Sequence, residues 1–275
     1  MDTSSEDPFF NVTQTSTECS AGKVDLPILY YEVSNVIAFF RCNSSDVKTQ
    51  LQGTPYYPAF KLFGKNLVGL SFYEYRKTGV GLYNEVGLAI PVTRDIDKKP
   101  FSCYYNGLIA DSENRKVGYY ILDLPVTTEI AWSAGRELWG YPKFVTDIPF
   151  SLDNRKFSSS VLDPHTNQPI LSMTGNIGRG IPMIPLNLVL YSILNGDELR
   201  TVVNVRGGVT LSGSGSCKLS VGESDHPMAI RLRDLGLNNS KPILMTRTTK
   251  FQSRLNAGKY QRTLSPSNMK VKIEV

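Results

Sequence analysis

The sequence has few of the residues that mark metalloproteins and nucleotide-dependent enzymes. Its 275 residues include only two histidines, His165 and His226, and four cysteines that lie far apart without Cys-x-x-Cys spacing. It contains no H-x-x-x-H pair, no third glycine at phosphate-loop spacing after Gly79 and Gly81, and no G-x-S-x-G motif. These absences argue against a metal site, a redox pair, a nucleotide cofactor and Ser-His-Asp catalysis.

Long apolar runs, a secretory signal and a basic stripe are also lacking. The first seven residues are acidic and polar, and no apolar run approaches the roughly 18 residues needed to cross a membrane. The formal net charge is +5, but Lys and Arg are scattered among acidic neighbours, as in residues 94–99. We therefore predict a cytoplasmic protein with no nucleic-acid or membrane partner.

The order of apolar and turn-forming residues predicts a chain made mostly of strands. Residues 1–22 are rich in Ser, Thr, Asp and Glu and are expected to be a flexible lead-in, followed by a single domain over residues 23–275. Runs of β-branched and aromatic residues bounded by Gly, Pro and Asn predict strands at residues 36–40, 67–75, 80–83, 117–122, 202–205 and 243–249.

Helical patterns are few. Residues 44–51 and 127–138 each begin with a capping residue and continue with helix formers, and residues 184–194 fit either a helix or a buried strand. The sequence thus predicts an α+β fold that is predominantly antiparallel β with a few short helices.

One lysine stands in an unusual setting. Lys143 follows Pro142 and is surrounded in sequence by Trp139, Tyr141 and Phe144. A lysine reacts as a nucleophile only without its proton, and apolar surroundings disfavour the charged form. A neutral lysine that meets a ketone forms an iminium, which accepts electrons from the neighbouring carbon. The plain alternative is a surface lysine after a turn.

Two further charged residues lie beside apolar strands. Glu85 stands within the segment 83–92, where a carboxylate is unfavourable unless it has a partner or a task. Arg41 ends the apolar run 36–40, and a fixed guanidinium there could hold a substrate carboxylate through two hydrogen bonds. The alternatives are an exposed glutamate at a strand start and a surface charge at a strand end.

These segments together resemble the acetoacetate decarboxylase family from about residue 28 onward. The similarity rests on GREL at residues 135–138 with YPK at 141–143, on the block at 83–92, on Arg41, and on residues 225–229 and 241–243. The resemblance implies that Lys143 is the Schiff-base lysine, that Glu85 is the active-site glutamate and that Arg41 faces the substrate. It also implies a closed or nearly closed antiparallel barrel with an apolar interior, a homo-oligomer, and no cofactor.

The chain departs from the family pattern at two positions. The founding decarboxylases have a second lysine directly after the Schiff-base lysine, where this chain has Phe144. An ungapped count places Leu70 where the family has a second glutamate. Without the adjacent lysine, the neutral amine would depend on desolvation or on a more distant cation such as Arg41 or Arg136.

The sequence therefore predicts a Schiff-base carbon–carbon lyase, most simply a decarboxylase of a β-keto acid or related carbonyl compound. Lys143 and Glu85 are the candidate catalytic residues. Tyr141 and Phe144 are candidate substrate-binding residues, like Arg41.

Arg136 and Glu137 are expected to form an ion pair that orients the lysine loop. One alternative is a Schiff-base aldolase, dehydratase or cyclase for a larger carbonyl compound, as in secondary metabolism. The other is a barrel that binds small molecules without catalysis.

Overall fold

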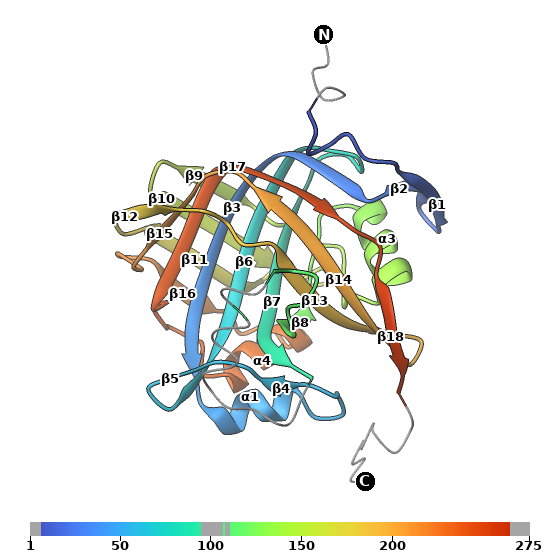
Figure 1. Ribbon diagram of the computed structural model, residues 1–275. Coiled ribbons are helices and arrows are strands. Elements are labelled where there is room, and N and C mark those ends of the chain that lie inside the picture. The colour runs from blue at the N-terminus through green and yellow to red at the C-terminus, as the bar shows by residue number, and fades with distance from the viewer. Residues whose placement is uncertain (1–6, 95–106, 108–110, 265–275) are drawn as a thin grey trace.

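The structure is a computed structural model that describes residues 7–94, 107 and 111–264. Its centre is a closed seven-stranded β-barrel (Figure 1). Around the barrel the strands follow one another in the order β17 (Leu244–Leu255), β3 (Ile28–Cys42), β6 (Lys65–Thr78), β7 (Tyr83–Thr93), β8 (Val117–Asp123), β13 (Leu188–Leu194) and β14 (Asp197–Arg206). The ring closes because β14 pairs with β17. Neighbouring strands are antiparallel except β8 and β13, which are parallel.

Further strands extend the barrel wall or flank it. β15 (Val209–Ser212) and β12 (Gly180–Met183) continue the sheet beyond β17, and β18 (Lys259–Thr263) pairs with β14. Two short strands, β4 (Tyr57–Pro58) and β5 (Lys61–Leu62), pair with β7 and β6. A separate four-stranded sheet has the order β16 (Lys218–Val221), β11 (Pro169–Asn176), β10 (Lys156–Leu162), β9 (Phe150–Asp153).

Part of the expected flexible lead-in carries regular structure. β1 (Thr15–Cys19) pairs with β2 (Gly22–Leu26) in an antiparallel hairpin. Upstream of it, Asp7 accepts a 2.8 Å hydrogen bond from Nη1 of Arg206, and Phe10 is buried. This polar segment is ordered by backbone pairing and by contacts with the barrel, which its composition does not reveal.

The described residues include the helices α1 (Ser44–Gln50), α3 (Glu129–Trp139) and α4 (Pro227–Asp234). α1 and α3 confirm the two predicted helices, whereas the ambiguous segment 184–194 contains the strand β13. The strand predicted at residues 80–83 is wrong, because the chain turns through Gly81 at φ 87° and β7 begins only at Tyr83. α3 lies beside the β1–β2 hairpin (Figure 1).

Several barrel strands, among them β6 and β7, are buried on both faces. On β6, Leu70 and Phe72 point outward and are fully buried in a core shared with the four-stranded sheet, where Phe72 and Phe157 pack edge to face at 5.2 Å. The alternate residues Tyr73 and Tyr75 point into the barrel. Burial on both faces explains why these strands read as nearly continuous apolar runs.

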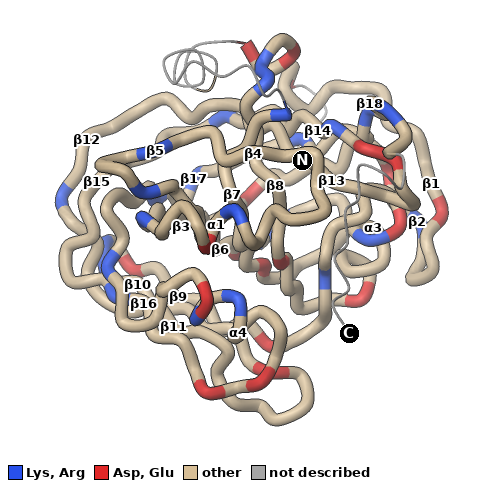
Figure 2. The backbone as a smooth tube through the Cα atoms, turned by 90° about the horizontal axis from the view of Figure 1, so that it is seen from below, with Lys and Arg blue, Asp and Glu red and all other residues tan. Residues whose placement is uncertain are grey.

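Charged residues are interspersed around the molecule (Figure 2). No helix in the described parts of the chain is long and apolar enough to cross a membrane. The α+β fold dominated by antiparallel strands, with a closed barrel and short helices, is confirmed.

Candidate functional site

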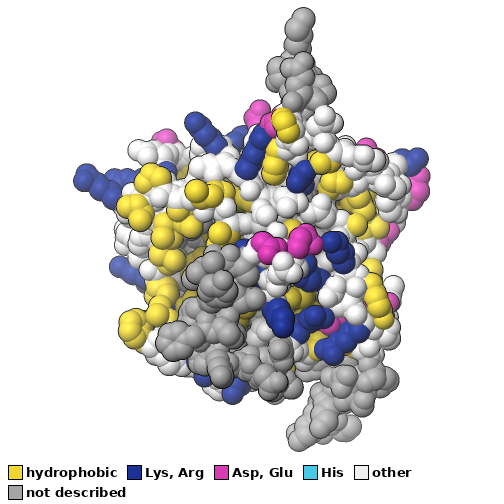
Figure 3. All heavy atoms as spheres, viewed as in Figure 1, with side chains coloured by type: hydrophobic (Ala, Val, Ile, Leu, Met, Phe, Trp, Pro, Cys, Tyr) yellow, Lys and Arg dark blue, Asp and Glu magenta, His cyan; other side chains and the backbone are white. Residues whose placement is uncertain are grey.

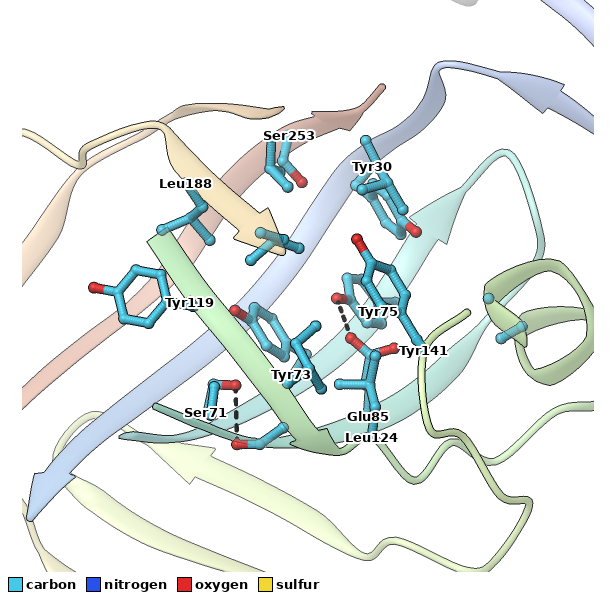
Figure 4. A pocket seen from close by; sticks show the side chains of 18 of the residues that line it. Tyr30, Ser71, Tyr73, Tyr75, Glu85, Tyr119, Leu124, Tyr141, Leu188 and Ser253 are labelled. Atoms are coloured by element: carbon cyan, nitrogen blue, oxygen red, sulfur yellow. Dashed lines mark hydrogen bonds between the residues drawn. The ribbon is translucent and has the colours of Figure 1, made fainter. Parts of the chain in front are cut away.

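The interior of the barrel is a cavity. It offers about 140 Å³ to the centres of water-sized molecules, and each of the seven barrel strands contributes side chains to its wall. α3 and the loop that follows it add much of the remaining wall, including Gly135, Tyr141 and Lys143. Most of the wall is aliphatic or aromatic (Figure 4).

The loop after α3 is held so that Lys143 points inward. α3 ends at Trp139, and the following Gly140 has a positive φ of 67° that lets the chain turn while its N–H caps the helix. Trp139 is almost completely buried and donates from its indole nitrogen to the carbonyl of Asn256 at 3.1 Å. The Leu124 N–H then donates to the carbonyl of Pro142 at 3.0 Å, which fixes the residue before Lys143 against the barrel wall.

Lys143 contacts Glu85 directly. Nζ of Lys143 lies 2.5 Å from Oε2 of Glu85, and both residues are buried, with 6% and 7% of their surfaces exposed. The hydroxyl of Tyr75 donates to the other oxygen of Glu85, Oε1, at 3.1 Å (Figure 4). Each oxygen of the carboxylate therefore has a partner inside the cavity.

Gly135 provides the space that Lys143 occupies. A Cβ atom added to Gly135 would lie 2.2 Å from Cε and 2.5 Å from Cδ of Lys143. Such distances are far below van der Waals contact, so the lysine side chain runs directly across the bare backbone of α3. A glycine in the middle of a helix lowers helix stability, and here it makes room for the lysine.

Six tyrosines line the cavity: Tyr30, Tyr73, Tyr75, Tyr83, Tyr119 and Tyr141. Burial is the main cause that raises the pKa of every one of these phenols above its usual value. For five of them, all but Tyr119, the negative charge of Glu85 raises the pKa further. The phenols are therefore neutral near pH 7 and act as hydrogen-bonding groups.

Among the predicted site residues, the cavity brings together Lys143, Glu85 and Tyr141. It does not include Arg41. That residue shares the inward face of β3 with Ile37 and Phe39, but the strand runs on past the enclosed part, and Arg41 is exposed with its guanidinium 5.7 Å from the ring centre of Phe63. Phe144 also lies outside the cavity, where its ring packs 4.4 Å from His226.

The expected ion pair between Arg136 and Glu137 does not form. Arg136 donates to the backbone carbonyl of Lys143 at 3.3 Å and stacks its guanidinium over Trp132 at 5.7 Å. Glu137 instead accepts hydrogen bonds from Ser20 of the β1–β2 hairpin. Adjacent helical residues point in different directions, which separates these two side chains. Arg136 still supports the lysine loop through the backbone.

Leu70 does not bear on the chemistry of the cavity. The pleat of β6 turns it into the outer core, whereas Ser71 and Tyr73 face inward, with Tyr73 directly opposite Glu85. Tyr75, which contacts Glu85, was not among the residues predicted from the sequence. The alternation of Ser71, Tyr73 and Tyr75 along a strand is the signal that could have placed it beside Glu85.

No group of three His, Cys, Asp or Glu side chains in the described residues is arranged to hold a metal ion. His165 is exposed in the turn that follows β10. His226 has a structural role, since its ring nitrogen Nδ1 accepts a hydrogen bond from Met228 N–H at the start of α4.

Comparison with known proteins relates this barrel to one enzyme family. The family model for acetoacetate decarboxylase matches residues 54–221. No curated protein matches the chain significantly.

Solved structures share the fold at low sequence identity. A structure of an acetoacetate decarboxylase has a TM-score of 0.58 at 16% identity, covering 86% of this chain and 90% of the other. The acetoacetate decarboxylase from Legionella pneumophila has a TM-score of 0.59 at 15% identity, covering 95% of both chains. The enduracididine biosynthesis enzyme MppR, in complex with pyruvate, has a TM-score of 0.61 at 10% identity, covering 87% and 92%.

The family match covers more than half of the chain and includes both Glu85 and Lys143. The protein therefore belongs to the acetoacetate decarboxylase family, as its sequence motifs predicted.

Proposed function

We propose that the protein is an enzyme in which Lys143 forms a Schiff base with a carbonyl substrate inside the barrel. The observation that carries this proposal is the buried 2.5 Å contact between Nζ of Lys143 and Oε2 of Glu85 in a largely apolar cavity. Such a pair is costly to bury compared with apolar side chains. Ionisable groups that face a cavity at such a cost are candidates for catalysis.

Glu85 is suited to move the protons of the reaction. Transfer of one proton from Nζ to Oε2 across the 2.5 Å contact converts the ammonium into the neutral amine that can attack a carbonyl group, and the carboxylate into a carboxylic acid. The amine attacks the carbonyl carbon and gives a carbinolamine. Glu85 then returns its proton as the hydroxyl leaves as water, so that its carboxylate faces the new iminium cation.

The iminium draws electrons from the bond at the neighbouring carbon. If that bond joins a carboxylate, carbon dioxide leaves and an enamine remains. If it joins a hydrogen, the Glu85 carboxylate can take the proton, and the resulting enamine can add to a second carbonyl group. Protonation of carbon and attack of water on the iminium release the product and restore the amine. Tyr75 serves as a positioning residue because it holds Oε1 of Glu85.

Two reaction types share this intermediate. Decarboxylation of a β-keto acid is the reaction that the family resemblance suggests first. The composition of the cavity favours the second type, an aldol, dehydration or cyclisation step, because the described wall offers no cation besides Lys143 to hold a substrate carboxylate. The similar barrel of MppR has been solved with the condensation product of pyruvate and imidazole 4-carboxaldehyde, which supports including condensation chemistry.

Borohydride trapping tests the Schiff base. The protein is incubated with ketones and aldehydes, reduced with borohydride, digested and analysed by mass spectrometry. We expect an adduct on the peptide that contains Lys143, and none in Lys143→Met. Lys259→Met is the matched control, because Lys259 is an exposed lysine paired with Glu113. Adducts that persist in Lys143→Met, or that never form on Lys143, would refute the proposal and favour a barrel that only binds small molecules.

A homo-oligomer in the cytoplasm remains a prediction. One flank of the molecule, over β12, β15 and β17, presents apolar side chains (Figure 3), and Ile181 and Ile184 are among the exposed ones. Light scattering coupled to size-exclusion chromatography would give the oligomeric state directly. A monomer at micromolar concentration would contradict this prediction.

A further inference from the structure

The wall of the barrel cavity restricts the charge of its ligand. We propose that the substrate is an uncharged, largely aromatic or aliphatic carbonyl compound, and that the hydroxyl of Tyr141 binds one of its oxygens. The inference rests on the proposed function for the carbonyl group alone, since only the Schiff base of Lys143 requires one. The charge and the apolar character follow from the wall itself.

The charges inside the cavity already neutralise each other. Lys143 and Glu85 are the only charged side chains among the described residues of the wall, and they are partners at 2.5 Å. A substrate carboxylate would have to displace Glu85 from Nζ, which would leave two carboxylates and one cation in an apolar space. Burial of a charge without a partner is strongly unfavourable.

The arginines expected near the lysine do not offer another cation. Arg41 is exposed at the end of β3 beside Phe63, and Arg136 directs its guanidinium to the backbone of Lys143 and the ring of Trp132. Neither residue belongs to the wall of the cavity. The cavity therefore disfavours a free keto acid as its ligand.

The cavity instead offers neutral hydrogen-bonding groups, and one of them, the Tyr141 hydroxyl, has an O–H that can donate to a ligand. Tyr30 and Tyr83 bond to each other at 3.2 Å, and Tyr75 bonds to Glu85. Although Tyr141 is 97% buried, the hydroxyl of the nearby Thr201 is the one protein group among the described residues that its own hydroxyl can bond to. Figure 4 shows the Tyr141 side chain beside Tyr75 and Glu85. A hydroxyl both donates and accepts, so the Tyr141 O–H can donate to a ligand oxygen while it accepts from Thr201. A buried O–H without an acceptor is unfavourable, and a ligand oxygen would satisfy it.

The rest of the wall suits a flat or apolar ligand. The rings of Tyr75 and Tyr83 stack with centroids 4.4 Å apart, and those of Tyr73 and Tyr75 lie 5.4 Å apart and nearly parallel. Leu188, Leu190 and other aliphatic side chains complete the opposite wall. Stacked rings and aliphatic groups favour aromatic and hydrocarbon parts of a ligand. A small keto acid would leave most of this surface without contact.

Analogues without a ketone or aldehyde group test the inference independently of the Schiff base. We would measure the binding of 4-phenyl-2-butanol and of 4-phenylbutanoate to the wild-type protein by calorimetry. The two compounds share ring and chain but differ in charge, and neither can form an iminium. We expect the alcohol to bind about tenfold or more tightly than the acid. Equal or tighter binding of the acid, or no binding of the alcohol, would overturn the inference.

Two variants test the role of the Tyr141 hydroxyl. Tyr141→Phe should weaken alcohol binding by about three- to tenfold, the usual range for loss of one hydrogen bond, while butylbenzene binding stays unchanged. Tyr191→Phe is the control, because this buried tyrosine donates to the carbonyl of Lys116 and does not line the cavity. If Tyr141→Phe weakens both ligands equally, or neither, the hydroxyl is not the donor.

The outcomes separate this inference from the proposed function. Borohydride trapping is carried out with 4-phenyl-2-butanone and with 3-oxo-5-phenylpentanoate, a neutral and an acidic carbonyl compound that correspond to the alcohol and the acid of the binding test. Preference for the neutral analogue without any trapped adduct would contradict the Schiff base alone. Trapped adducts together with preferred binding of the acids would contradict the neutral substrate alone.

Discussion

The inner and outer faces of the same barrel strands differ in what their burial accomplishes. On the outer face of β6, Leu70 and Phe72 are fully buried against other protein groups. On its inner face, Tyr73 and Tyr75 are buried around a cavity that also contains Glu85 of β7. The outer face gains stability from close packing. The inner face keeps polar groups in an apolar space, which is useful only if a ligand meets them.

Two ion pairs show the same contrast. Inside, Lys143 and Glu85 face the cavity. Outside, Arg231 of α4 lies 2.5 Å from Oδ1 of Asp123 at the end of β8 and donates to the carbonyl of Leu122 at 3.1 Å, which ties the helix to the barrel. We expect changes to the inner pair to alter chemistry and changes to the outer pair to alter stability.

The largest effect is expected from removing the charged group of Lys143, the cation inside the cavity. Lys143→Met should abolish the trapped adduct and lower turnover by roughly a thousandfold or more, because the covalent step is removed. It should also destabilise the fold, because the buried Glu85 carboxylate loses its partner. The double variant with Glu85→Gln should recover stability without activity, as denaturant titration would show. Retained turnover in Lys143→Met would show that the inner ion pair is not needed for chemistry.

The next effect concerns the glycine under the lysine. Gly135→Ala should slow adduct formation by roughly a hundredfold, since the new Cβ displaces Cε and Cδ of Lys143 and small misplacements of a nucleophile are costly. Trapping rates with a fixed ketone would measure it. Gly208→Ala is the control, because a Cβ there meets nothing within 4 Å. Equal trapping rates in both variants would mean that Lys143 can move aside freely.

A smaller effect on activity is expected from the outer face. Leu70→Ala should lower the free energy of unfolding by about 2–5 kcal/mol, the range for a buried leucine, while the trapping rate of the folded protein stays nearly constant. Ser71→Ala, one residue away on the inner face, should change the free energy of unfolding much less. A large loss of trapping rate in Leu70→Ala would show that the two faces are coupled.

The outer ion pair, Arg231 with Asp123, should affect how the stability of the fold changes with pH and should leave the trapping rate unchanged. Burial raises the pKa of Asp123 from 3.8 to about 6, although Arg231 opposes the shift. The folded state then binds the Asp123 proton more tightly than the unfolded state does. The stability gained from this tighter binding is fully present below pH 4 and is lost as pH rises through about 6. Between these limits the free energy of unfolding changes by about 3 kcal/mol, at 1.36 kcal/mol per pKa unit.

Asp123→Asn removes the titrating group and keeps a polar side chain beside Arg231. Between pH 4 and 7, the thermal unfolding temperature should therefore fall less steeply with rising pH in this variant than in the wild type. The trapping rate at pH 7 should be unchanged. Parallel pH profiles of the two proteins would show that Asp123 does not titrate in this window.

The sequence predicted the buried pair at the centre of the cavity better than the arrangement of the residues around it. Lys143 and Glu85 stood out because a charged side chain among apolar neighbours is unusual, and the family motifs supported both. Arg41 was expected beside them, but sequence order does not show where a long strand leaves the enclosed part of a barrel. Counting without gaps assigned Leu70 to the site, whereas the pleat directs Ser71 and Tyr73 inward.

The barrel itself depends on contacts that a local pattern cannot reveal. The strands at residues 36–40 and 67–75 were visible as apolar runs, and the predicted helices matched α1 and α3. Closure comes from the pairing of β14 with β17, which joins Val203 to Leu255 across a long stretch of chain. The barrel was predicted from the family resemblance, whereas apolar periodicity alone would have predicted only a β-rich domain.

The number of strands has a consequence for the barrel wall. A ring with an odd number of strands cannot alternate direction throughout, so at least one pair of neighbours must run the same way. That mismatch falls between β8 and β13, whose register includes only Leu190 with Tyr119 and Tyr191 with Tyr120, whereas β13 and β14 share seven pairs. Tyr119 and Leu190 both line the cavity. The odd number of strands thus requires one parallel seam, which in this barrel is also the seam with the fewest paired residues and borders the cavity.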